Sequence, residues 1–186
     1  MAILNNQSND TKNMKIGILG GTFDPVHIGH LVMAETAADA FALDKVFMVV
    51  AHQSPFKGGE IAGPQHRLAM VKEAIKGNSR IRACDIELKR GGKSYTIDTV
   101  QYFKNKYSSA ELFLVIGEDN VPGLSRWKDI EIIKEMARVI AVERDWFDVS
   151  SSLVRRRLKE RKSIRYLTPD AVIRYINQHK LYTGLC

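Results

Sequence analysis

Residues 15–31 read Lys-Ile-Gly-Ile-Leu-Gly-Gly-Thr-Phe-Asp-Pro-Val-His-Ile-Gly-His-Leu, and they carry the strongest structural signal in the chain. The apolar start predicts a short buried strand that the paired glycines end. Asp24 and Pro25 predict a turn, and a helix is expected to begin near His27. A strand, a glycine-rich loop and a helix N-terminus, in that order, favour phosphate binding.

The loop glycines and the first helical turn supply the candidate groups. Gly20 and Gly21 let backbone N–H groups approach an anion without a Cβ in the way. His27 and His30 are three residues apart and so share one face of the first turn. Gly29, between them, leaves room for a ribose or a base. Two surface histidines at a tight turn are one alternative. A zinc site is another, but it needs a third ligand, and no Cys or acidic residue has a helpful spacing.

Alternating strands and helices predict the overall fold. We expect an α/β, Rossmann-like, three-layer α/β/α architecture with a mainly parallel sheet and a helical C-terminal end. Ligands of such folds bind beyond the C-terminal strand edges, near the topological switch. Residues 1–13 are polar and aperiodic, which predicts a flexible extension, and residues 14–186 are expected to form a single domain. The other predicted strands are 45–50, 80–88, 111–116 and 138–142, and the other helices are 64–76, 96–107, 129–136, 150–159 and 171–179.

Composition narrows the function classes. The formal net charge of +7 favours anionic partners, and much of it lies in a basic run at 155–165 that predicts a solvated helix face. Aromatic residues do not interleave with that run, so a nucleic acid is not the expected partner. No signal peptide or bilayer-spanning run is indicated, so no membrane partner is expected. Cys84 and Cys186 are too few for a disulfide framework. A cytoplasmic protein is expected.

Two motifs carry a resemblance. Gly-Gly-Thr-Phe-Asp-Pro-Val-His-Ile-Gly-His, at 20–30, resembles the nucleotidyltransferase superfamily signature, a His/Thr-x-Gly-His motif after the first strand. Residues 149–155 are similar to the second signature, Ile-Ser-Ser-Thr-x-x-Arg, with Val149 and Ser152 as replacements. Hydroxyls and N–H groups gather there at a helix N-terminus, and Arg155 can hold phosphate bidentately. Serine capping is the alternative. Together, the motifs predict a site for the ATP phosphates.

Further segments resemble the bacterial nicotinate-nucleotide adenylyltransferases. They are Ser-Tyr-Thr-Ile-Asp-Thr at 94–99, Ile-Gly-Glu-Asp at 116–119 with Trp127 following, and Ile-Arg-Tyr-Leu-Thr-Pro-Asp at 164–170. Residues 52–57 are a looser match to a Pro-Pro-His-Lys segment and retain Lys57. The resemblance covers residues 14–182. One departure is a connection before the serine motif that is long in the family and short here, between Arg144 and Ser150.

The resemblance implies a reaction and its residues. ATP and nicotinate mononucleotide would give deamido-NAD and pyrophosphate, a step of NAD biosynthesis, with catalysis by positioning and charge stabilisation. Mg²⁺ would be held mainly by phosphate oxygens, without a dedicated metal site in the protein. The implied catalytic residues are His27, His30, Lys57 and Arg155. ATP binding is implied for Gly20, Gly21, Thr22, Phe23, His27, Gly29, His30, Ser151, Ser152 and Arg155, and acceptor binding for Thr22, Lys57, Tyr95, Thr96, Asp119 and Trp127.

The residues that are expected to bind the acceptor, nicotinate mononucleotide, also have simpler explanations. Trp127 offers an apolar face for a pyridine ring, or it is a core tryptophan. N–H groups near Thr96 at a helix N-terminus would bind the nicotinate carboxylate, or Thr96 is only a cap. Asp119 follows a strand end, where it would meet a ribose hydroxyl or cap the next turn.

Other functions stay open at this point. The acceptor is alternatively nicotinamide mononucleotide, or phosphopantetheine, whose adenylyltransferase has a similar serine motif. That enzyme is not expected to have the segments around Tyr95 and Asp119. A non-catalytic nucleotide- or nucleic-acid-binding module is the alternative from another class, and a steep salt dependence of binding would indicate it. A homo-oligomer is also compatible with the sequence.

Overall fold

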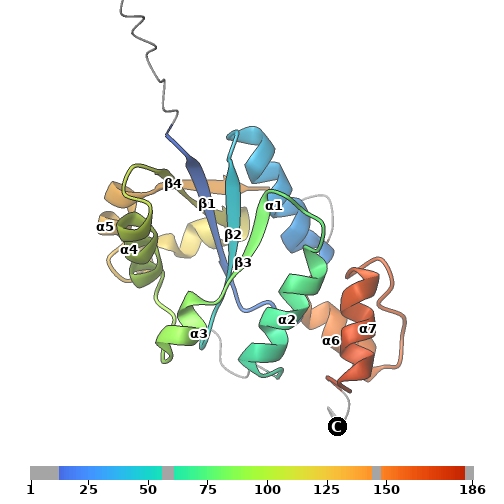
Figure 1. Cartoon of the computed structure of the whole chain (residues 1–186). Helices are drawn as coiled ribbons and strands as arrows, with labels where there is room; N and C mark the ends of the chain where they lie inside the picture. The colour runs from blue at the N-terminus through green and yellow to red at the C-terminus, as the bar shows by residue number, and fades with distance from the viewer. Residues whose placement is uncertain (1–12, 56–60, 144–147, 183–186) are drawn as a thin grey trace, which may run out of the picture.

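The structure is a computed structural model that describes residues 13–55, 61–143 and 148–182 (Figure 1). The flexible extension predicted at 1–13 lies outside the described residues except for residue 13, and the predicted catalytic Lys57 lies outside them too. The short connection before Ser150 lies partly outside them too. Within the described ranges, none of the helices combines the length and apolar character needed to cross a membrane.

A five-stranded parallel sheet forms the centre of the molecule, in the order β3-β2-β1-β4-β5. The chain runs outward from β1 to β3 and then returns to the other side of β1 to add β4 and β5. This reversal puts the topological switch between β1 and β4. The Rossmann-like prediction is confirmed. The strands are β1 (Lys15–Gly21), β2 (Lys45–Val50), β3 (Ile81–Cys84), β4 (Glu111–Gly117) and β5 (Arg138–Val142).

Helices cover both faces of the sheet, as predicted (Figure 1). One face packs against α1 (Ile28–Ala40), α2 (Pro64–Ala74), α6 (Ser151–Lys159) and α7 (Asp170–Gln178). The other packs against α4 (Thr96–Lys106) and α5 (Ile130–Met136). The short α3 (Ile86–Arg90) and the 3-10 helix η1 (Glu118–Arg126) follow β3 and β4 directly.

Alternation along the central strands builds two cores. In β1, Ile16 and Ile18 belong to the apolar cluster on the α4–α5 side, while Leu19 belongs to the cluster on the other side. All three are at most 2% exposed. Burying such a side chain contributes about 1.5–3 kcal/mol. Both faces of the sheet are covered by helices, so apolar residues suit nearly every position of the strand. This nearly continuous apolar pattern is what predicted the strand from the sequence.

Two expectations about element boundaries are wrong. β1 continues through both glycines, because Gly20 and Gly21 pair with residues of β2. The segment 80–88 is a strand only as far as Cys84, and α3 follows. The last helix begins at Asp170, one residue before the expected Ala171, and the hydroxyl of Thr168 donates to the Val26 carbonyl. The other predicted helices and strands are confirmed, with small shifts at their ends.

Candidate active site

The turn between β1 and α1 is shaped by Phe23. Its backbone has a φ of 51° and its ring is 1% exposed. A Cβ at Gly21 would lie 2.8 Å from that ring, so only glycine fits there without displacing it. The ring edge packs against His30 at a centroid distance of 4.9 Å. Gly21 and Phe23 thus support His30. Gly20, a strand residue upstream of the turn, has open space where a Cβ would be.

The two histidines lie on one face of the first turn of α1, as predicted. Their rings stack with centroids 3.7 Å apart. The His27 backbone N–H donates to Nδ1 of His30 over 3.2 Å. A neutral His30 therefore carries its proton on Nε2, where it can donate to a phosphate oxygen. His27 is only 1% exposed and His30 is half-buried, so His30 is the more accessible donor.

The start of α6 lies against the start of α1. The Ser151 hydroxyl donates to the Pro25 carbonyl over 2.8 Å, and Nη1 of Arg155 donates to the Asp24 carbonyl over 2.5 Å. A Cβ at Gly29 would lie 3.7 Å from the Val149 carbonyl oxygen. The two motifs that are predicted to bind phosphate therefore lie in contact, with two helix N-termini side by side.

The three serines of the second motif have different contacts. Ser150 caps α6, since its hydroxyl accepts from the Leu153 N–H over 3.1 Å. Ser151 binds the β1–α1 turn, and Ser152 is exposed with its hydroxyl 3.4 Å from Nη2 of Arg155. Capping and site formation are thus divided among neighbouring residues. Ser152 and Arg155 remain the pair most open to a ligand.

Asp24 ties the turn to distant segments, a role that the sequence did not indicate. Its carboxylate is 3% exposed and accepts from the N–H groups of Ile61 and Ala62, at 2.8 and 3.2 Å. It also accepts from the Tyr182 hydroxyl over 2.6 Å. Burial raises the pKa of Tyr182 far above its ordinary value, so that hydroxyl stays protonated and donates. The sequence motif had suggested only a turn at Asp24.

A second missed residue is Arg67 of α2, whose side chain is 1% exposed. Its guanidinium donates to the carbonyls of Thr22 and Ala51, both at 2.7 Å, and of His52 and Ala62, at 3.0 and 3.1 Å. It thereby joins the carboxyl ends of β1 and β2 and places a positive charge beneath the site. The sequence does contain one indication that Arg67 is buried, because it stands beside the apolar residues that form the buried face of α2.

Tyr95 and Thr96, which are predicted to bind the mononucleotide, are linked to the carboxyl end of β2 by hydrogen bonds of the preceding Ser94. The Ser94 N–H donates to the Gln53 carbonyl over 2.8 Å, and the Ser94 hydroxyl accepts from the His52 N–H over 2.9 Å. Ala51 in turn donates to the Gly21 carbonyl. These bonds place Tyr95 and Thr96, where α4 begins, along the sheet edge that also carries the β1–α1 turn.

Trp127 and Asp119 follow β4, across the switch from β1. Trp127 is half-buried and packs, like Tyr95, against the α4–α5 core. The ammonium of Lys128 lies 5.0 Å from the Tyr95 ring centre, so the two segments are neighbours. Asp119 is exposed in the first turn of η1 and accepts from the Asn120 amide. Both residues thus stand at the edge where ligands of this fold bind.

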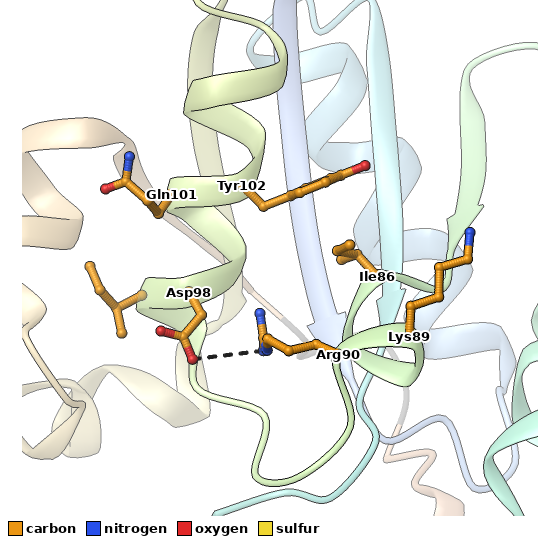
Figure 2. Close-up of a pocket in the computed structure, with 7 residues that line it drawn as sticks. Ile86, Lys89, Arg90, Asp98, Gln101 and Tyr102 are labelled. Carbon is orange, nitrogen blue, oxygen red and sulfur yellow. Dashed lines mark ion pairs between the residues drawn. The ribbon is translucent and has the colours of Figure 1, made fainter.

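One cleft lies outside this arrangement (Figure 2). It is formed between α3 and α4, and Arg90 reaches across it to Asp98, with 3.9 Å between their charged atoms. None of its lining residues is a predicted site residue. They are Ile86, Lys89, Arg90, Ile97, Asp98, Gln101 and Tyr102.

Comparison with known proteins agrees with this geometry. Residues 18–157 match the family model described as Cytidylyltransferase-like. The chain is 37% identical over 191 residues to a probable nicotinate-nucleotide adenylyltransferase of Opitutus terrae, covering 91% of this chain and 98% of that protein. A protein of the same name from Halalkalibacterium halodurans is 42% identical over 188 residues, with 90% and 91% covered. The chain belongs to the nicotinate-nucleotide adenylyltransferase family.

Solved structures confirm the fold of this adenylyltransferase family member. A putative nicotinate-nucleotide adenylyltransferase from Vibrio parahaemolyticus superimposes with a TM-score of 0.76 at 24% identity, over 88% of this chain and 99% of that one. A Plasmodium falciparum nicotinic acid mononucleotide adenylyltransferase complexed with NaAD gives 0.74 at 18% identity, over 91% and 98%. At these identities the likeness concerns the fold alone.

The alignments also indicate residues that this adenylyltransferase lacks. The match to the Opitutus terrae protein extends over 191 residues while covering 91% of a chain of 186. The relative therefore has residues without a counterpart here. A shortened connection before Ser150 is in keeping with that difference.

Proposed function

We propose that this protein transfers the adenylyl group of ATP to nicotinate mononucleotide, giving deamido-NAD and pyrophosphate in NAD biosynthesis. The observation that carries the proposal is the joining of the two helix starts by Ser151 and Arg155, beside the stacked histidines. Positive groups and N–H groups from two distant parts of the chain are thereby directed at one anionic ligand. The names of the relatives fit this activity.

The reaction needs little proton transfer. An oxygen of the mononucleotide phosphate, already ionised at neutral pH, forms a bond to the α-phosphorus of ATP. The bond from that phosphorus to the bridging oxygen breaks, and its electron pair leaves with pyrophosphate. The barrier comes from bringing two polyanions together and from charge that builds on the phosphoryl oxygens. Positioning and electrostatic stabilisation therefore supply most of the catalysis.

In our proposal, positioning and stabilisation of the phosphates are the task of the phosphate end of the site, where α1 and α6 begin. His30, through Nε2–H, and His27 donate to the transferring phosphate. Arg155 and the N–H groups at the start of α6 hold the triphosphate and then the leaving pyrophosphate, assisted by the dipoles of both helices. Lys57 is proposed to add a further positive charge, because it matches the lysine of the family's Pro-Pro-His-Lys segment.

The acceptor end binds the mononucleotide. Thr96 and its neighbours present N–H groups to the nicotinate carboxylate, since the first turn of a helix leaves such donors unpaired within the helix. The half-buried Trp127 offers its indole face to the pyridine ring. Asp119 and Thr22 are proposed to contact polar groups of the same substrate.

We propose that Mg²⁺ is held here mainly by phosphate oxygens and water. In the described ranges, no group of three or more His, Cys, Asp and Glu side chains is arranged to bind a metal. The Asp24 carboxylate is turned into the protein, with the Ile61 and Ala62 N–H groups and the Tyr182 hydroxyl bound to it. When bound, Mg²⁺ would neutralise phosphate charge.

Other parts of the proposal concern the protein as a whole. We take residues 14–186 as one nucleotidyltransferase domain that acts on small molecules in the cytoplasm, with an oligomeric state left to measurement. The net charge of +7 supports two anionic substrates.

The test is turnover with ATP and each acceptor, followed as pyrophosphate release. We expect release with nicotinate mononucleotide, and much less with nicotinamide mononucleotide or phosphopantetheine. Turnover mainly with one of those two acceptors would overturn the assigned substrate while keeping adenylyl transfer. No release with any acceptor, together with steeply salt-dependent binding of DNA or RNA, would favour a binding module instead.

A further inference from the structure

Glu87 is a buried carboxylate that the mechanism above does not use. It lies in α3, and the residue is 6% exposed. Its neighbours on that helix, Ile86, Lys89 and Arg90, line the outer cleft, whereas the Glu87 side chain is turned inward. A buried acid costs free energy unless hydrogen bonds compensate it.

Two hydroxyl groups provide those hydrogen bonds. Thr99 of α4 donates to Oε1 of Glu87 over 2.5 Å, and the Ser94 side chain also bonds to the carboxylate. Ser94 already accepts from the His52 N–H, which can only donate. Its own proton is therefore available for Glu87. The result is a chain of bonds from the end of β2 through Ser94 to Glu87 and on to Thr99.

This chain of bonds surrounds the start of α4. Ser94 lies just before the helix, and Thr99 lies one turn inside it, so Glu87 holds both sides of Tyr95 and Thr96. Those two residues open the helix that the proposed function assigns to the acceptor carboxylate. A shift of that first turn would move every N–H group directed at the substrate.

The outer side of the same helix pair provides a comparison (Figure 2). Arg90 and Asp98 also link α3 to α4, but at 3.9 Å and with side chains 28% and 42% exposed. Exposed pairs of this kind contribute little. The buried contacts of Glu87 are therefore better able than this exposed pair to fix the start of α4.

We propose that Glu87 is a positioning residue that sets the N-terminus of α4, and with it the affinity for the mononucleotide acceptor but not for ATP. The inference rests on the proposed function for its substrate. The structural half of the inference, namely that Glu87 fixes residues 94–96, does not depend on the proposed function.

The structural half is tested without any substrate. Amide hydrogen exchange is measured at His52 and Ser94, whose N–H groups both belong to this network. Glu87→Gln keeps the size of the side chain but removes its charge and one acceptor oxygen, and we expect exchange about tenfold faster at both amides. Arg90→Gln, the control on the same helix, should leave them unchanged. Unchanged exchange in Glu87→Gln would overturn the proposal.

The functional half is tested by steady-state kinetics on a second pair of variants. Thr99→Val removes the hydroxyl that donates to Glu87, whereas Thr99→Ser keeps it. We expect KM for the mononucleotide to rise about tenfold in Thr99→Val and Glu87→Gln, with KM for ATP and kcat little changed. Thr99→Ser should restore the wild-type value. A merely structural role would lower the amount of active enzyme and leave both KM values alone.

The outcomes separate this inference from the proposed function. If wild-type protein turns over no mononucleotide, the proposed function fails and the acceptor half of the inference fails with it, while hydrogen exchange still decides the structural half. If wild-type is active and the variants raise both KM values equally, or neither, the proposed function stands and Glu87 is not a positioning residue for the acceptor.

Discussion

The two ends of the proposed site are held in opposite ways. We call them the phosphate end, where α1 and α6 begin, and the acceptor end, where α4 begins. At the phosphate end, side chains such as Ser151 and Arg155 bind backbone carbonyls of the β1–α1 turn. At the acceptor end, hydroxyl groups bond to the buried carboxyl group of Glu87. Carbonyls carry no net charge, so Arg155 keeps its positive charge for a ligand. A buried carboxylate instead makes local geometry depend on charge and pH.

This contrast predicts that damage at the phosphate end reduces the rate with little effect on the fold. His30→Ala should lower kcat by about 10²–10³, the usual loss when one donor to a developing charge is removed. Pyrophosphate release at saturating substrates measures it. His66 lies on α2, and its ring bonds to the Tyr175 hydroxyl of α7. His66→Gln serves as the control and should keep its rate. A His30→Ala enzyme with normal turnover would refute the catalytic assignment.

Arg155 tests the same end with a smaller expected effect. Arg155→Gln should lower kcat/KM for ATP roughly 10- to 100-fold, because a hydrogen bond to a charged group contributes about 1.5–3 kcal/mol. The next residue, Arg156, is exposed on the same helix. Arg156→Gln should change kcat/KM for ATP little. Equal losses in the two variants would mean that general positive charge, rather than the geometry of Arg155, attracts ATP.

Gly20 and Gly21, the last two residues of β1, differ in the space around them, so they test whether the contact with Phe23 is what requires glycine. Gly21→Ala should destabilise the protein by about 1–3 kcal/mol, since the new Cβ would lie 2.8 Å from the buried Phe23 ring. Gly20→Ala meets open space and should change the free energy of unfolding by well under that amount. Urea denaturation of the two variants decides. Similar losses would show that strand pairing, not the Phe23 contact, requires glycine.

At the acceptor end, stability should depend on pH through Glu87. Burial raises the pKa of this carboxyl above its ordinary value of 4.5, with hydrogen bonds from Thr99 and Ser94 opposing the shift. As pH rises past 4.5, the unfolded chain loses this proton first, so the folded state loses stability until pH reaches the folded pKa. Each unit of pKa difference corresponds to about 1.4 kcal/mol.

The matched measurement is urea unfolding of wild-type protein and Glu87→Gln across pH 4 to 8. The two proteins share every other titrating group, so those contributions cancel in their difference. We expect the wild-type advantage to shrink as pH rises above about 4.5. A difference that stays constant, or that grows with pH, would mean that Glu87 does not titrate as its burial requires.

Much of the fold was readable because its signals are local. The apolar run in β2 and the start of α6 at the serines lie where the sequence predicted them. That His27 and His30 share one face follows from helical spacing, and the stacking of their rings is seen only in the structure. The prediction was wrong at 80–88, where apolar residues recur after Cys84 at Ile86 and Leu88 but α3 replaces the strand. There Glu87 bonds to Thr99, a partner later in the sequence.

The sequence by itself determined the family, the alternation of strands and helices, and the two motifs at helix starts, because each depends on neighbours a few residues away. Only the tertiary structure decided how these parts join. Arg155 meets Asp24 across 131 residues, and Tyr182 meets the same aspartate across 158. A buried polar group must find a partner, but which one depends on where the folded chain passes. That choice made Asp24, Arg67 and Glu87 the supports of the site, and no local pattern could specify it.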